Sequence, residues 1–223
     1  MLHSAGANLL HRDNYGATAL SMAAMKGYAA QAQYFIDNGV PVNTPDNNGR
    51  TPLMIATTHG HARTVSTLLE NGACLTSQDR AGWSSVHFAT RQVGGHDSFR
   101  AVLDTLLAAA HGNSSVLDLR DSDGRTALMY AVLQGTEAAV DALAKAGADP
   151  RLVDNGGSTA YSMAHSEYIK RRIAEVSAEW ETRAHDEWMK NQKQKRRGSR
   201  EKTMKTSKQK AQHMKNNQCP INP

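Results

Sequence analysis

Aromatic residues and cysteines are scarce in this sequence of 223 residues. Phe, Trp and Tyr make up 5% of the chain, and all hydrophobic residues together make up 39%. A core must therefore be built mainly from Ala, Leu, Val and Met, which favours small, closely packed helices. The two cysteines, Cys74 and Cys219, lie far apart in unlike surroundings. This pattern argues against a disulfide framework and favours a reducing compartment.

Long apolar segments are also missing. No apolar run approaches the roughly 18 residues needed to span a bilayer, and the N-terminus lacks the charged-then-apolar pattern of a signal peptide. We therefore expect an intracellular protein, cytoplasmic or nuclear, without membrane insertion. The sequence contains no Gly-rich phosphate loop and no nucleophile elbow. It therefore favours a protein that is not an enzyme and carries no cofactor and no metal.

Charge is divided unevenly along the chain. Of the 26 Lys and Arg residues, 11 lie in residues 189–223, together with one of the 21 Asp and Glu residues, so this segment carries a charge of +10. The remainder holds 15 basic and 20 acidic residues, a charge of −5. The body and the tail are therefore expected to have different partners.

A short motif recurs along the body of the chain. It contains an Asp, a Gly three residues later, a Ser or Thr two residues after the Gly, and then an apolar-periodic run. The copies begin at Asp13, Asp46, Asp79, Asp121 and Asp154, in steps of 33, 33, 42 and 33 residues. A fixed period of this length predicts a solenoid, in which each unit buries its apolar face against its neighbours.

Each position of the motif has a physical role. The glycine, as in Gly49, is expected at positive φ in a turn. The following hydroxyl, as in Thr51, is expected to cap a first helix by accepting a free backbone N–H, and Pro52 suits the first helical position. Leu53 and Ala56 are expected to face inward. A second helix then follows and ends at a glycine.

The pattern resembles the ankyrin repeat, and residues 46–73, DNNGRTPLMIATTHGHARTVSTLLENGA, match the family motif at nearly every position. Met54 stands where the family usually has His. The resemblance covers about residues 2–165. It implies two antiparallel helices and a protruding β-turn finger per repeat, stacked into a curved array that binds proteins. The sequence thus predicts an all-α ankyrin-repeat solenoid of helix-turn-helix units with β-turn fingers, a C-terminal capping helix and a disordered basic tail.

Two departures from the motif stand out. Residues 1–12 match only the end of a repeat, which indicates either a bare first repeat or a chain that starts inside a longer array. The third copy is nine residues too long. We expect five extra residues around RQVGGHDS to lengthen the loop between its helices, and four around AAAHGNSSVLDL to lengthen the approach to the next finger. Such insertions arise either as neutral drift in a surface loop or as functional additions.

Several stretches resemble chemical motifs but fit the repeat better. HRDN at His11–Asn14 lacks the Asn of a kinase catalytic loop, because Thr18 holds that position. HGH at His59–His61 has no third ligand at metal spacing. DSDGR at Asp121–Arg125 lacks the Glu of a calcium loop near Val132. His87 occupies the family's His position after the capping hydroxyl, where a structural hydrogen-bonding role is expected.

The C-terminal part is expected to form a cap and a tail. The ankyrin array is assigned to residues 1–165 and the helical cap to residues 166–188. Its apolar stripe, expected to be buried on the fourth repeat, consists of Ile169, Ile173, Val176 and Trp180, with Trp188 beyond. Residues 189–223 are rich in Lys and poor in hydrophobic residues, so disorder is expected. Their basic cluster, Lys195, Arg196 and Arg197, is compatible with an import receptor, with nucleic acid or with a solubilising role.

We predict a monomeric scaffold or adaptor that binds an unidentified protein partner on its concave face and fingers. The alternatives are a nucleic-acid-associated or nuclear regulatory protein acting through the tail, and a fragment of a larger ankyrin-containing enzyme or channel. The family resemblance places contacts on the fingers at Asn14, Tyr15, Asn47, Asn48, Arg50, Arg80, Trp83, Asp123 and Arg125. It places others at the ends of the first helices at Met25, Lys26, Thr58, His59, Arg91, Gln92, Leu133 and Gln134.

Trp83 is singled out among these residues. It follows the finger glycine of the lengthened repeat, at a position where other copies hold Ala17, Arg50, Arg125 or Ser158. The repeat itself therefore does not require an aromatic residue there. We expect Trp83 to be an exposed anchor for a partner, flanked by Arg80 and Arg91. The alternative is a local core formed when the longer loops fold over it.

Overall fold

A computed structural model describes residues 8–92, 97–182 and 189 of the chain, and the side chains of residues 92–98 are not described. The chain divides into two compact units, Met1–Ser177 and Ala178–Pro223. The expected tail beyond residue 189, with Lys195, Arg196 and Arg197, lies outside the described residues, as does Trp188. The first unit contains the repeats and is the subject of the following paragraphs.

Four of the five predicted caps of the first helices form, whereas the Ser84 hydroxyl lies 2.8 Å from His87 Nδ1. The Thr18 and Thr51 hydroxyls accept hydrogen bonds from the backbone N–H groups of Ser21 and Met54, at 3.2 and 3.4 Å. Thr126 and Thr159 cap their helices in the same way. Pro52 occupies the first turn of its helix, where a missing N–H donor has no cost. These side chains satisfy donors that a helix would otherwise leave unpaired, and they set where each first helix starts.

Each finger is closed by the Asp that begins the motif. Asp46 Oδ1 accepts the backbone N–H groups of Asn48 and Arg50, at 2.8 and 2.9 Å. Gly49 completes the turn at φ 83°, a conformation that other residues rarely adopt. The glycines at this position in all five copies have positive φ, which confirms the prediction of a repeated turn.

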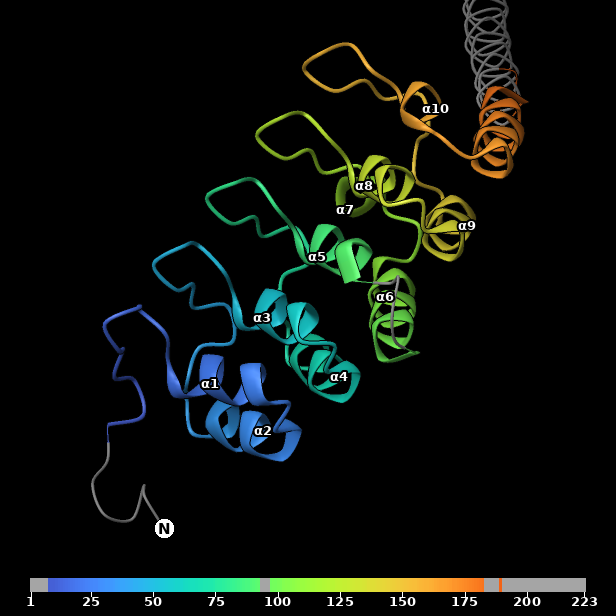
Figure 1. Ribbon diagram of the computed structural model, residues 1–223. Helices are drawn as coiled ribbons and strands as arrows, with labels where there is room; N and C mark the ends of the chain where they lie inside the picture. The colour runs from blue at the N-terminus through green and yellow to red at the C-terminus, as the bar shows by residue number, and fades with distance from the viewer. Residues whose placement is uncertain (1–7, 93–96, 183–188, 190–223) are drawn as a thin grey trace, which may run out of the picture. The chain divides into compact units, whose positions relative to one another are not determined.

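The helices of the first unit form two rows, with the fingers projecting from one side (Figure 1). In the inner row, α1 (Ala19–Lys26), α3 (Pro52–Thr58), α5 (Ser85–Gln92), α8 (Ala127–Leu133) and α10 (Ala160–Met163) pack in succession. In the outer row, α2 (Ala29–Asp37), α4 (Ala62–Glu70), α6 (Asp97–Ala110) and α9 (Glu137–Ala146) do the same. The predicted inward residues Leu20, Leu53, Val86 and Leu128 are buried between the rows.

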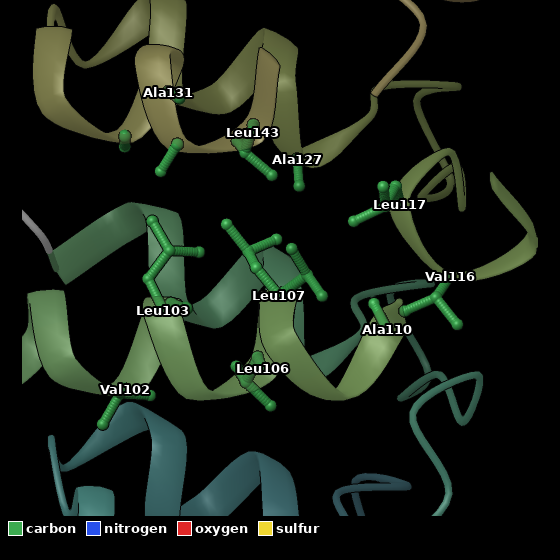
Figure 2. Packing of buried hydrophobic residues seen from close by; sticks show 14 of the residues in the cluster. Val102, Leu103, Leu106, Leu107, Ala110, Val116, Leu117, Ala127, Ala131 and Leu143 are labelled. Carbon is green, nitrogen blue, oxygen red and sulfur yellow. The ribbon is translucent and has the colours of Figure 1, made fainter. Parts of the chain in front are cut away.

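The insertions of the third repeat fold largely as helix. Helix α6 has 14 residues, whereas α4 has nine. Its Leu103 and Leu107 are buried in the hydrophobic core where α6 packs on α9, and α7 (Ser114–Leu117) adds the buried Leu117 (Figure 2). The approach to the fourth finger is therefore longer, as expected, and it contains the short helix α7. The Ala- and Leu-rich segment continues the helix because its apolar face finds a partner, and Asn113 then caps α7 by accepting the Ser115 N–H at 2.9 Å.

The end of the first unit is covered by helical residues 167–177. Ile169 and Ile173 are fully buried in the main core, and Val176 is also buried. Tyr168 and Arg172 both donate to Asp141 of α9, at 3.0 and 2.8 Å. These contacts place the predicted apolar stripe, up to Val176, against the fourth repeat.

The described part of the second unit is short. Residues 178–182 are helical, and Trp180 is half-buried rather than fully buried. Within residues 8–92, 97–182 and 189, no helix combines the length and apolar character that a bilayer-spanning segment requires.

Candidate functional site

The candidate site is the surface made by the fingers and by the first helices, which we call the inner face. Side chains reach it from two positions of the repeat. One position follows the finger glycine. The other lies four residues after the capping hydroxyl and is occupied by Met22, Ile55, Phe88, Tyr130 and Met163. Because the repeats stack in register, equivalent residues of neighbouring repeats form rows across this face.

The stretches that resemble catalytic and metal motifs are used for folding. Asp13 Oδ1 accepts the N–H groups of Tyr15 and Ala17, at 2.9 and 2.8 Å, and so closes the first finger. Asp121 does the same in the fourth finger for Asp123 and Arg125, at 3.0 and 2.8 Å. Within the described residues, no group of three His, Cys, Asp or Glu side chains is arranged to hold a metal ion.

The histidines are also bound to backbone groups. His59 Nδ1 lies 2.9 Å from the carbonyl oxygen of Ile55, and His61 Nε2 lies 3.0 Å from that of Met25. His61 thereby links the first and second repeats. The two imidazole rings stack at 6.1 Å. The HGH stretch therefore joins neighbouring repeats.

His87 has the structural role that its position in the repeat predicts. Its Nδ1 lies 2.8 Å from Ser84 Oγ and accepts the Ser84 N–H at 3.2 Å, while Nε2 lies 3.1 Å from the carbonyl oxygen of Arg125. Burial lowers the pKa of His87 because the imidazolium form would lose its hydration. A neutral His87 thus connects the start of α5 to the fourth finger.

A groove of about 450 Å³ lies between the first two repeats on the inner face. Its lining includes predicted contact residues from both fingers and both first helices: Tyr15, Met25, Asn48, Arg50, Thr58 and His59. Met22 and Ile55 add apolar surface that the sequence prediction did not include. The groove joins an apolar floor to a polar rim, which is typical of surfaces that take a side chain from a partner.

Trp83, in the third repeat, packs against Phe88 and Tyr130, and we call these three rings the aromatic wall. Its ring centroid is 5.3 Å from that of Phe88 and 4.6 Å from that of Tyr130. Arg91 places its guanidinium carbon 5.9 Å from the Trp83 centroid, as the predicted polar flank requires. Trp83 remains half-buried. The rings of Phe88 and Tyr130 come from α5 and α8. The lengthened loop at residues 93–96, which the alternative prediction invoked, lies outside the described residues.

Tyr130 connects this aromatic wall to the fourth finger. Its hydroxyl donates to Asp121 Oδ2 at 2.6 Å. The pKa of Tyr130 is raised, mainly by burial and also by this hydrogen bond, so the group stays protonated. Arg125 also interacts with Tyr130 and lies 3.6 Å from Asp154 of the next finger. The orientation of the Trp83 ring is thus supported by a network that extends over three fingers.

The remaining predicted contact residues are distributed around these two places. Asn14, Asn47, Lys26, Arg80, Asp123, Leu133 and Gln134 are exposed. The Asn47 side chain donates to the Asn14 carbonyl oxygen at 3.1 Å, so it holds two fingers together. The side chain of Gln92 lies outside the described residues. The sequence prediction missed Met22, Phe88 and Tyr130, although an apolar residue before the shared Ala of every repeat was a readable signal.

An array of stacked helix pairs with projecting fingers defines a repeat solenoid. A family model described as ankyrin repeats (3 copies) matches residues 1–79 and 75–154. The chain belongs to the ankyrin-repeat family, as its motif predicted. Ankyrin repeats generally mediate protein–protein interaction and are typically non-catalytic modules. A search of curated proteins found no significant match.

Proposed function

We propose that this chain is a non-catalytic scaffold or adaptor that binds a protein partner on its inner face, the concave face of an ankyrin array. One observation carries the proposal. Trp83 presents a partly exposed ring on a wall of aromatic side chains that already fixes its position. Tryptophan is enriched among the residues that dominate binding energy. A ring held in place before binding loses little conformational entropy when the partner arrives.

The groove between the first two repeats supplies a second contact area. Met22 and Met25 line it, and methionine side chains adapt to partners of irregular shape. Tyr15, which is 79% exposed, stands at its edge. The groove and Trp83 lie in successive repeats, so one partner segment can contact both.

Replacing Trp83 tests the proposal. Proteins captured by the full chain are identified, and the affinity of each purified partner is compared for wild type and Trp83→Ala. We expect binding to weaken by about 2 kcal/mol or more, roughly 30-fold, because the anchor ring is lost. Tyr34→Ala is the matched control, since Tyr34 is an exposed aromatic residue of the outer row. Equal binding by wild type and Trp83→Ala would refute Trp83 as the anchor.

Trp83→Ala will also lower stability somewhat, since the ring packs on Phe88 and Tyr130. Binding is therefore measured well below the melting temperature of the variant. Trp83→Phe gives a second variant that keeps an aromatic ring in the wall. We expect it to restore most of the stability and only part of the affinity.

The charge of +10 on residues 189–223 favours a second function, contact with nucleic acid or with an import receptor. Neutralising Lys195, Arg196 and Arg197 together tests it. We expect loss of nuclear enrichment or of nucleic-acid retention, and the latter should fall steeply with salt. If both properties persist unchanged, the tail acts only as a solubilising segment.

A further inference from the structure

The residues that directly follow the finger glycines form a row across the fingers, in which arginine and tryptophan alternate. Successive fingers place Arg50, Trp83 and Arg125 there, between Ala17 and Ser158 at the ends. Backbone hydrogen bonds hold these fingers in register. Arg80 N donates to Asn48 O and Ser122 N donates to Ala81 O, both at 3.0 Å. A tryptophan is thus placed between two arginines from the neighbouring repeats.

Both flanking arginines are held in position by carboxylates. Arg50 contacts Asp46 through Nε at 3.0 Å and through Nη2 at 2.9 Å. Arg125 lies 3.6 Å from Asp154 and 3.7 Å from Asp123. A guanidinium has five N–H donors, so one carboxylate leaves several donors unused. The two side chains remain 40% and 35% exposed. Each therefore presents oriented donors to an incoming group.

A third guanidinium lies beside the ring. Arg91 sits in the last turn of α5, with its guanidinium carbon 5.9 Å from the Trp83 centroid, and its side chain is exposed. In the part of the chain that the structure describes, neither Arg91 nor Arg80 is within ion-pair distance of a carboxylate. These two cations have charge available for a partner.

We propose that the inner face binds an extended acidic segment of a partner protein. An apolar side chain of that segment covers Trp83, and its carboxylates pair with Arg91 and with the free edges of Arg50 and Arg125. This inference rests on the proposed function and specifies the chemistry of the partner. Charge complementarity supplies the reason, because a planar guanidinium donates two parallel hydrogen bonds to a carboxylate.

Single-stranded nucleic acid would also present a stacking group and negative charge, but the charges favour a peptide. Asp46, Asp123 and Asp154 already neutralise much of the row. Residues 1–188 carry a charge of −5. A phosphate backbone needs several uncompensated cations along its path. A peptide with one or two carboxylates does not.

Selection from a displayed library of random 12-residue peptides tests the inference, using the full chain as bait. We expect the enriched peptides to contain Asp or Glu next to Leu, Phe, Trp or Tyr. Arg91→Glu should abolish that acidic enrichment and weaken a peptide selected on wild type at least tenfold. Arg63→Glu, a charge reversal at an exposed position of the outer-row helix α4, should bind that peptide like wild type.

The basic tail is identical in all these variants, so it provides an internal control. An acidic enrichment that survives Arg91→Glu would come from the tail and would overturn the inference. Enrichment of apolar peptides without acidic residues would overturn it too, while leaving the proposed protein-binding function intact. Failure to enrich any peptide would count against both. Arg91→Gln, which removes the charge without reversing it, keeps the test valid if Arg91→Glu does not fold, as judged by circular dichroism.

The nucleic-acid alternative has its own readout. A 20-nucleotide oligo-dT labelled with a fluorophore is titrated with wild type and with Arg91→Glu. We expect equal affinities, because any binding would come from the tail. If Arg91→Glu lowers the affinity for oligo-dT as much as it lowers the affinity for the peptide, the row would be assigned to nucleic acid instead.

Discussion

Single residues set the pH response expected of the array. His87 stays neutral because the pKa of its buried ring is lowered below the ordinary value of 6.5. In the unfolded chain the same ring takes up a proton as the pH falls through about 6.5. Its contribution to stability is therefore complete above that pH and declines as the pH falls toward the folded pKa. Each unit by which folding lowers the pKa corresponds to about 1.4 kcal/mol of unfolding free energy lost at low pH.

Comparing His87→Met with wild type isolates this effect. Met54 and Met129 occupy the same position in neighbouring repeats and are buried, so methionine fits the site. We expect the loss of unfolding free energy between pH 7.5 and pH 5.5 to be smaller in His87→Met. Urea denaturation at both pH values measures it. Identical pH dependence in the two proteins would show that His87 does not contribute.

A finger glycine and a glycine that ends a second helix differ in what surrounds them, and this predicts different costs of substitution. A Cβ at Gly82 would lie 2.8 Å from the Asp121 Cα of the next finger, whereas a Cβ at Gly39 would meet nothing within 4 Å. Both residues have positive φ, 80° and 84°. Gly39→Ala should cost about 1 kcal/mol for the left-handed backbone alone. Gly82→Ala should cost clearly more, because adjacent fingers must also separate.

Denaturant unfolding of the two variants measures this difference. Equal losses of stability would mean that the fingers move apart freely. The stacking of backbone on backbone between the fingers would then contribute little to the array.

Among the helical elements, residues 167–177 close the last open face of the array. Ile169 and Ile173 are fully buried, and burying such a side chain is worth roughly 1.5–3 kcal/mol. A chain ending at Glu167 should therefore melt at a lower temperature or aggregate. A chain ending at residue 188 retains this helical segment and serves as the control. An unchanged melt for the shorter chain would show that the segment is not a cap.

The third repeat shows how an element responds to inserted residues. Helix α6 extends through Ala110, and α7 follows within the insertion. The added apolar residues are buried, for example Val116 at 5% exposure and Leu117 at 1%. The insertion therefore adds buried apolar side chains within the repeat that carries Trp83.

The whole molecule combines an acidic body with a basic tail, and we propose that they act separately. Limited trypsin digestion checks the expected flexibility of residues 189–223, where 11 of the chain's Lys and Arg residues lie. We expect rapid cleavage there and a resistant core that ends near Trp188. Cleavage within residues 13–165 at a comparable rate would contradict this division. Pull-downs with and without residues 189–223 then assign each partner to the body or the tail.

The sequence by itself determined the repeat and its local structure. The turn at Gly49, the cap at Thr51 and the helix start at Pro52 depend on contacts within a few residues, so the motif predicts them directly. Period and motif together also identified the family. The positions of Trp83 and Arg91 as candidate contacts followed from their places within the repeat.

Only the tertiary structure decided how those places combine into a site. Trp83 meets Tyr130 because α5 packs on α8, and Arg125 reaches Asp154 because neighbouring fingers stack. Both pairs join separate repeats, and the motif of a single repeat holds no information about them. The folding of the insertion into α6 and α7 was also beyond sequence reasoning. A short Ala-rich segment is stable as a helix when neighbouring elements cover its apolar face, and tertiary packing supplies that cover.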